Sequence, residues 1–162
     1  MPELTTLEEK LAEVIGLAMA AQGATTKVTS LLRDEELTRQ LERMGEEAAE
    51  AEQRAIQVAA GRVGRKTAIL QEARSVKRKA TEMMKDYLES SSEGLDGFEF
   101  LTMAEAGEVG HWAVLGELNK KARNRDVREL VLWQLPIQRR HFKEAQEGLL
   151  TLAREEDPDG TG

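Results

Sequence analysis

The sequence predicts an all-α protein, namely one antiparallel helical bundle built from two helical hairpins and a connecting helix. Aromatic residues make up 4% of the 162 residues and charged residues 33%, while Ala, Leu, Glu and Arg are abundant. Straight-chain residues lose little side-chain freedom in helices, whereas a β-sheet would need more Val, Ile, Thr and aromatic residues. Apolar residues also recur every three or four positions along most of the chain, which is the period of an amphipathic helix. A chain of this length can bury a core without disulfides or a structural metal.

The first hairpin is expected over residues 6–61. Its first helix covers about 6–32, since residues 5–9 (TTLEE) contain two overlapping capping-box patterns. Asp34 is a good N-cap for the second helix, and Gly61 is typical of a helix end. The connection between the two helices is short, so they run antiparallel. The apolar seam of the second helix consists of Leu37, Leu41, Met44, Ala48, Ala51, Ala55 and Val58.

A connecting helix is expected over residues 66–88, either as a crossover between the hairpins or as a fifth packed helix. Residues 62–86 carry eight Lys and Arg against three acidic residues. This basic stripe is expected to face solvent or an acidic partner. The chain has a net charge of −7, and no aromatic residues alternate with the basic ones, so nucleic acid is an improbable partner. The residues expected to face inward from this helix are Ile69, Val76, Ala80 and Met83.

The second hairpin is expected over residues 98–155, after the longest internal loop, Ser90–Gly97. A short turn at 124–126 makes its two helices antiparallel. Residues 1–156 therefore form a single helical-bundle domain, and residues 157–162 (DPDGTG) form a disordered tail.

The composition also limits cofactors and location. Cysteine is absent, which excludes disulfides and thiolate metal sites. The acidic N-terminal segment does not resemble a signal peptide, and the longest apolar run, residues 14–21, is too short to span a bilayer. We expect a cytoplasmic protein without a membrane partner. The alanine-rich seam would suit tight pairing of hairpins, so a homo-oligomer is expected.

Four polar residues interrupt the apolar seams of the second hairpin. Glu108 and His111 lie three residues apart on one helix, and Gln138 and His141 repeat this spacing on the other. Such spacing places each pair on one helix face. A turn near Asn124 would bring Glu108 opposite His141 and His111 opposite Gln138. A buried carboxylate needs a hydrogen-bonding, positively charged or metal partner, so the set predicts either a hydrogen-bonded polar layer or a metal site.

The stretch AEAGEVGHWAVLGEL…VLWQLPIQRRHFKEA, within residues 104–145, resembles a hairpin of the ferritin-like superfamily, in particular the rubrerythrin-type di-iron and di-manganese carboxylate proteins. In that family one helix of each hairpin supplies a Glu and the other a Glu-x-x-His pair. By this resemblance Glu108 corresponds to the lone carboxylate and Gln138–His141 to the pair, with His111 as an additional ligand or a partner of a ligand.

The first hairpin departs from that pattern. It contains no His, and Ala48 and Ala51 stand where a Glu-x-x-His pair belongs. Gln22 lies at the matching depth, while Glu47 and Glu50 are expected to be solvated flank positions.

The expected function is thus a ferritin-like bundle that binds one iron, manganese or zinc ion through a reduced site of Glu108, His111 and His141, completed by Gln138 or water. Two alternatives remain open at this stage. The first is a non-enzymatic helical module for self-association or partner binding, and the more distant second is a di-iron oxidase.

Overall fold

The computed structural model describes residues 3–161, of which 82% are helical and none lies in a strand. Residues 1, 2 and 162, which belong to the expected domain and tail, lie outside the described residues. The all-α prediction is confirmed. The helices are α1 (Thr6–Thr29), α2 (Glu35–Ala60), α3 (Lys66–Tyr87), α4 (Gly94–Ala122) and α5 (Arg125–Arg154).

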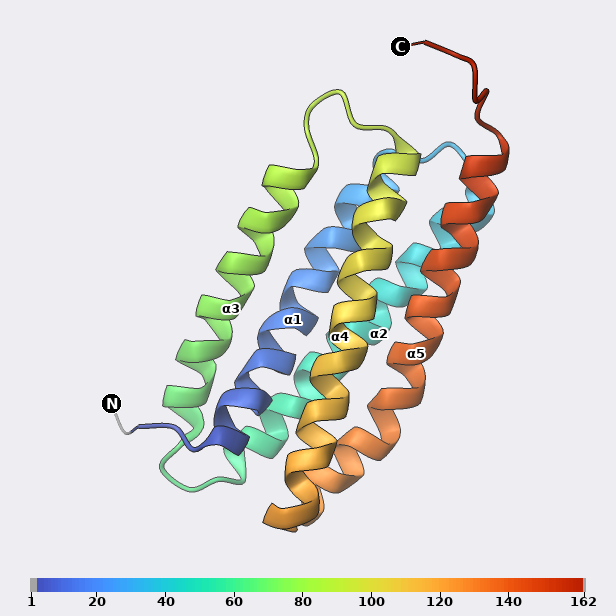
Figure 1. The fold of residues 1–162 in the computed structure, drawn as a ribbon. Helices are drawn as coiled ribbons and strands as arrows, with labels where there is room; N and C mark the ends of the chain where they lie inside the picture. Colours follow the sequence, from blue (N-terminus) through green and yellow to red (C-terminus); the bar gives the residue numbers. More distant parts are fainter. Residues whose placement is uncertain (1–2, 162) are drawn as a thin grey trace.

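Successive helices run in opposite directions, and four of them form a ring (Figure 1). Around this ring α1 packs against α2 and α4, and α5 packs against α4 and α2. Helix α3 lies outside the ring against α1, with lesser contact to α2. It runs from the end of the bundle where α2 stops to the opposite end, where α4 begins (Figure 1). The chain between the two hairpins therefore crosses the length of the bundle as a packed helix.

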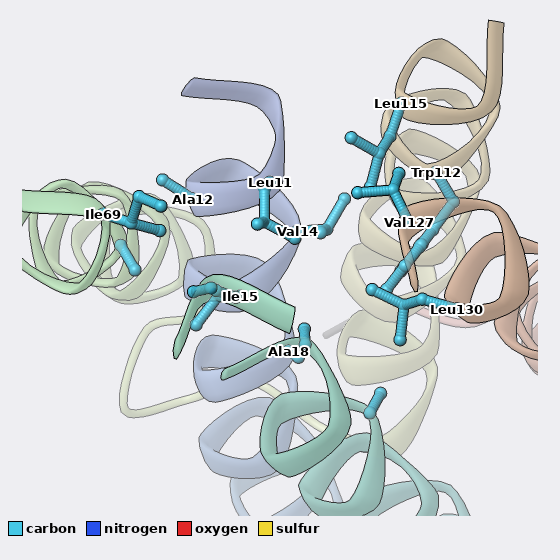
Figure 2. Packing of buried hydrophobic residues seen from close by; sticks show 14 of the residues in the cluster. Leu11, Ala12, Val14, Ile15, Ala18, Ile69, Trp112, Leu115, Val127 and Leu130 are labelled. Atoms are coloured by element: carbon cyan, nitrogen blue, oxygen red, sulfur yellow. The ribbon is translucent and has the colours of Figure 1, made fainter. Parts of the chain in front are cut away.

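The apolar core consists of two clusters, one toward each end of the bundle. The larger cluster joins α1 to α3, α4 and α5 through residues such as Ile15, Ile69, Trp112 and Leu130 (Figure 2). The second cluster lies toward the 88–93 connection and includes Met44, Phe98 and Leu101 among others. The polar residues that interrupt the seams lie between these two clusters.

Several boundaries differ from the sequence-based expectation. The longest internal break covers 88–93 rather than 90–97, because Glu93 and Asp96 form a capping box that starts α4 at Gly94. Helix α1 ends at Thr29, three residues earlier than expected, and Ser30 is its C-cap. Across residues 3–161, no helix is long and apolar enough to cross a membrane.

The later part of the basic stripe faces away from the bundle as expected, since Lys77, Arg78 and Lys79 are all exposed. At its start, however, Arg62 and Arg65 turn inward and bind the buried Glu8. Ile69 is fully buried, but the expectation that Met83 faces inward is wrong, because Met83 is 63% exposed. The physical reason is that α3 packs mainly on the single helix α1. One neighbour covers only a narrow strip of a helix surface.

Candidate functional site

A layer of buried polar side chains separates the two apolar clusters. Glu105 and Glu108 from α4 and Gln138 and His141 from α5 are each no more than 7% exposed. Glu47 reaches the same layer from α2, with its side chain 20% exposed. Three helices of the ring therefore contribute ionisable or amide groups at one level of the core.

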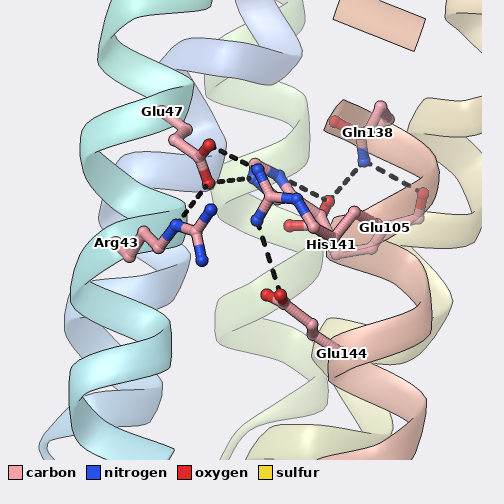
Figure 3. Close-up of polar contacts among 7 residues, drawn as sticks. Arg43, Glu47, Glu105, Gln138, His141 and Glu144 are labelled. Carbon is pink, nitrogen blue, oxygen red and sulfur yellow. Dashed lines mark hydrogen bonds and ion pairs between the residues drawn. The ribbon is translucent and has the colours of Figure 1, made fainter. Parts of the chain in front are cut away.

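The imidazole of His141 lies between carboxylates from two other helices (Figure 3). Its Nε2 atom is 3.1 Å from Oε1 of Glu47, which is a hydrogen-bond distance. Its Nδ1 atom is 4.0 Å from Oε2 of Glu105, which is longer than a hydrogen bond. His141 is thus hydrogen-bonded to α2 and lies near, but is not hydrogen-bonded to, Glu105 of α4.

Glu105 and Glu108 form a buried pair of acids beside an amide. Nε2 of Gln138 donates to the carboxylate of Glu105 and also to its backbone carbonyl oxygen, at 3.2 Å for the latter. Burial raises the pKa of Glu108 well above its usual value, and the negative charge of Glu105 raises it further. Gln138 opposes this effect only in part. Ionisation of Glu108 beside Glu105 is therefore disfavoured in this layer.

Glu47 is held in place by arginine side chains. Its carboxylate accepts a hydrogen bond from Arg140, and Nε of Arg43 lies 3.6 Å from it. Burial raises the pKa of Glu47, but hydrogen bonds from Arg140 and His141 outweigh burial and leave the pKa below its usual value. Arg140 also lies 3.4 Å from Oε1 of Glu144, whose Oε2 is buried without a partner among the described residues. Its arginine and histidine partners therefore favour the ionised form of Glu47.

The structure brings together three of the four expected site residues but not His111. Nδ1 of His111 lies 3.0 Å from Glu13 of α1, and the His111 side chain is 44% exposed. The expected convergence of Glu108, His111 and His141 is therefore wrong. Both expected pairs across the hairpin are wrong as well, because Glu105 rather than Glu108 faces His141, and Gln138 contacts Glu105 and Glu108 rather than His111.

A difference in register of one helical turn explains this exchange. The turn closes on Arg123, which has φ of 54°, and the side chain of Asn119 hydrogen-bonds the backbone of Asn124. Successive residues of a helix point about 100° apart, so residues three or four positions apart share a face. A small shift of α4 along α5 at the turn therefore replaces the residue that faces His141 with the next one on the same face of α4. That residue is Glu105, three positions before Glu108.

The expectation that Glu47 is solvated is also wrong. Ala48 and Ala51 are the core-facing residues of α2 at this level, and their short side chains leave room for the longer Glu47. Glu50 behaves as expected, since it is half exposed and pairs with Arg54 at 2.9 Å. Gln22 donates a hydrogen bond to Glu52 of α2 at 2.7 Å.

Sequence reasoning missed Glu105 as a site residue, although the spacing Glu105-x-x-Glu108 already placed both acids on one helix face. Within residues 3–161, no three His, Asp or Glu side chains are already arranged as a metal-binding group. Comparisons with protein-family models, with curated proteins and with solved structures find no match for this chain.

Proposed function

We propose that the protein is a ferritin-like bundle that binds one divalent metal ion, iron, manganese or zinc, in the buried polar layer. The proposed ligands are Nδ1 of His141 and the carboxylates of Glu105 and Glu108. The observation that carries the proposal is the gap of 4.0 Å between Nδ1 of His141 and Oε2 of Glu105. Two metal–ligand bonds of about 2.0–2.2 Å to a shared ion span a gap of this size.

The orientation of His141 supports this assignment. When Nε2 donates to Glu47, the proton is on Nε2, and the lone pair of Nδ1 faces the oxygen of Glu105. Two lone pairs that face each other repel, unless a cation or a proton lies between them. A carboxylate that orients the far nitrogen of a ligand histidine is a common feature of metal sites. Glu47 would serve in this way.

The charge of the layer supports a cation as well. Glu105 and Glu108 are adjacent, buried and acidic, and the raised pKa of Glu108 expresses the cost of ionising both. A divalent ion would neutralise the pair, and imidazole with carboxylate ligands suits iron, manganese and zinc. The side chains would have to close around the ion, as they do not form a three-ligand group by themselves.

The path of the chain supports the ferritin-like assignment. Ferritin-like bundles join their two hairpins by one long crossover connection. Here α3 spans the bundle between the end of α2 and the start of α4 (Figure 1). We propose a single ion because Ala48 and Ala51 on α2 cannot bind a second one.

Metal analysis tests the proposal. The protein is stripped with EDTA, equilibrated with Zn²⁺ or Mn²⁺, freed of excess ion and analysed for bound metal. We expect about one ion per chain for the wild type, because three ligands are available to one ion. His141→Ala should lose the ion, whereas His111→Ala should retain it. The two histidines are the only ones in the chain, so each variant is a matched control for the other.

Either of two results would contradict the proposed metal site. One is a wild-type protein that holds no Zn²⁺ or Mn²⁺ above the level of a buffer blank. The other is a His141→Ala variant that holds as much metal as the wild type.

The second candidate function is a non-enzymatic helical module that self-associates. A specific observation favours it, since the outer faces of α4 and α5 expose apolar side chains. Leu132 is 69% exposed, and Val114 and Leu150 are 44% and 48% exposed. In that case a doubly protonated His141 between Glu47 and Glu105 would make the layer purely structural. Light scattering over a range of protein concentrations measures self-association, and a Leu132→Glu variant should reduce it.

A further inference from the structure

A groove of about 260 Å³ lies between α1, α3 and α4. Its volume is close to the lower end of the range for small-molecule sites. Helix α3 packs on α1 and makes no comparable contact with α4, so a groove remains between α3 and α4. The rings of Tyr87 and Phe100, whose centroids lie 5.5 Å apart, join α3 to α4 at one end. Glu108 and His111 line the groove farther along α4.

The walls of the groove are apolar and adaptable. Alanines from α1, among them Ala20 and Ala24, form its floor, and methionines from α3 and α4 line its sides. Met83 and Met103 are 63% and 51% exposed, so the groove opens to solvent between flexible side chains. Methionine adapts its shape to irregular apolar ligands. The groove thus suits an alkyl chain.

The charged groups that line the groove are acidic, apart from one histidine. Glu105 and Glu108 line its inner side, and His111, which pairs with Glu13, lies beside them. An ammonium head would donate a charge-assisted hydrogen bond to the carboxyl group of Glu108, whereas a carboxylate head would find no Lys or Arg among the described residues that line the groove.

We propose that this groove binds a linear alkyl chain with a primary ammonium head, the chain lying between the methionines and the head meeting Glu108. Phe100 and Glu108 lie about 12 Å apart along α4, which suits a chain of about eight carbons. The inference goes beyond the proposed metal site and does not depend on it, although the two share Glu108.

Calorimetric titration of the EDTA-treated protein tests the head group. Octylammonium should bind about ten-fold more tightly than octanol, because only the ammonium forms a charged hydrogen bond. Octanoate should show no saturable binding. Glu108→Gln should lower the affinity for octylammonium to that for octanol. Glu99 is an exposed acid on the same helix, and Glu99→Gln should leave the ratio of the two affinities unchanged. Equal binding of octanoate and octylammonium would overturn the proposal.

A pair of glycine variants tests the location. Gly107 lines the groove and Gly110 does not, and an added Cβ at either position meets no atom within 4 Å. Gly107→Trp should abolish binding, whereas Gly110→Trp should retain it. Methyl NMR signals of Met83, Met84 and Met103 should shift with octylammonium, and that of the core residue Met44 should not. The opposite pattern in either measurement would place the ligand elsewhere.

These tests separate the two proposals. If the protein binds octylammonium but takes up no Zn²⁺, the ammonium site is supported and the metal site is contradicted. If the protein takes up Zn²⁺ but binds octylammonium and octanoate equally, only the ammonium site is contradicted.

Discussion

Glu8 joins two segments of the chain at one end of the bundle. Its carboxylate accepts hydrogen bonds from Arg62 and Arg65, each at 2.8 Å at the closest, and from the backbone N–H of Thr5 at 2.9 Å. The side chain is 1% exposed. The hydrogen bond from Arg65 is the main reason that the pKa of Glu8 falls to about 2, despite burial. Glu8 therefore ties the start of α1 to the connection between α2 and α3.

The first prediction follows from this contact. Glu8→Gln should destabilise the protein at pH 7 by about 1.5–3 kcal/mol, the range for hydrogen bonds to charged groups. The folded pKa of Glu8 is about 2 against 4.5 unfolded, so its contribution is complete above 4.5 and is lost as the pH falls toward 2. Urea denaturation at pH 7 and pH 3 measures the difference between wild type and variant, which should shrink at pH 3. Glu9→Gln, an exposed neighbour, is the control. An equal loss at both pH values would contradict the ionic explanation.

The second prediction concerns Glu108, whose pKa shift has the opposite sign to that of Glu8. Its pKa is raised in the folded state, so the folded protein binds the proton more tightly, and stability falls as the pH rises above 4.5. Glu108→Gln should therefore stabilise the metal-free protein at pH 8 by about 1–3 kcal/mol, the cost of a poorly satisfied buried group, and much less at pH 5. Urea denaturation in EDTA at both pH values checks this. Glu50→Gln, at a half-exposed acid, should have little effect. A variant less stable than wild type at pH 8 would contradict the prediction.

For individual residues, the sequence predicts the burial of polar side chains more accurately than it predicts their contact partners. Glu108, Gln138 and His141 are buried as expected, because a polar residue on an apolar seam has nowhere else to point. His111 falls near the edge of that face and reaches Glu13 on another helix instead. Contacts between helices distant in sequence, such as Glu47 with His141, depend on packing angles that no single helix encodes.

Among the elements, the contact between α1 and α3 depends on a close approach at Gly16. A Cβ on Gly16 would lie 2.4 Å from the carbonyl oxygen of Ala73 and 2.7 Å from Cβ of Val76. Neither atom is the end of a flexible side chain, so the two helices would have to separate. Gly23 on the same helix has nothing within 4 Å of such a Cβ.

The third prediction uses these two glycines as a matched pair. Gly16→Ala should destabilise the protein by about 1–3 kcal/mol through overpacking. Gly23→Ala should stabilise it by about 0.5–1 kcal/mol, because alanine loses less backbone freedom in a helix. Thermal or urea denaturation of both variants measures the difference. Similar stabilities for the two would show that α3 does not need this close approach.

The element boundaries were predictable where a side chain caps the helix. Asp34 was predicted as an N-cap, and Thr5 begins one of the two capping-box patterns that the sequence left open. Both side chains accept backbone hydrogen bonds as N-caps. The start of α4 was placed too late because Gly94 and Gly97 were interpreted as loop residues. Gly97 is instead packed against Val28, where a Cβ would lie 2.9 Å from Cγ1 of that residue. A glycine required for packing looks the same in a sequence as a glycine required for a turn.

For the whole molecule, the position of α3 was the question that the sequence left open. Its seam predicted one packed face but not the helix that the face would meet. In the structure α3 has a single main neighbour, α1, which is itself surrounded by α2, α3 and α4. A helix outside the ring buries less surface than one within it, and α3 has three buried residues, Ala68, Ile69 and Ala73, all in its first half.

The last prediction is that α3 opens before the four-helix ring does. Regions with few buried apolar contacts open at lower free energy than the core. Backbone amides of residues 76–87 should therefore exchange with solvent at a free energy at least about 1 kcal/mol below that of the α1 amides, which should exchange only with global unfolding. Native-state hydrogen exchange in low concentrations of denaturant measures both. Gly16→Ala should further lower the free energy of exchange of the α3 amides. It should leave the difference in exchange free energy between α4 and α5 unchanged, because the added Cβ meets only residues of α3. Exchange of α3 and α1 at one common free energy would mean that all five helices unfold as a single unit, with α3 as much a part of the bundle as the four helices of the ring.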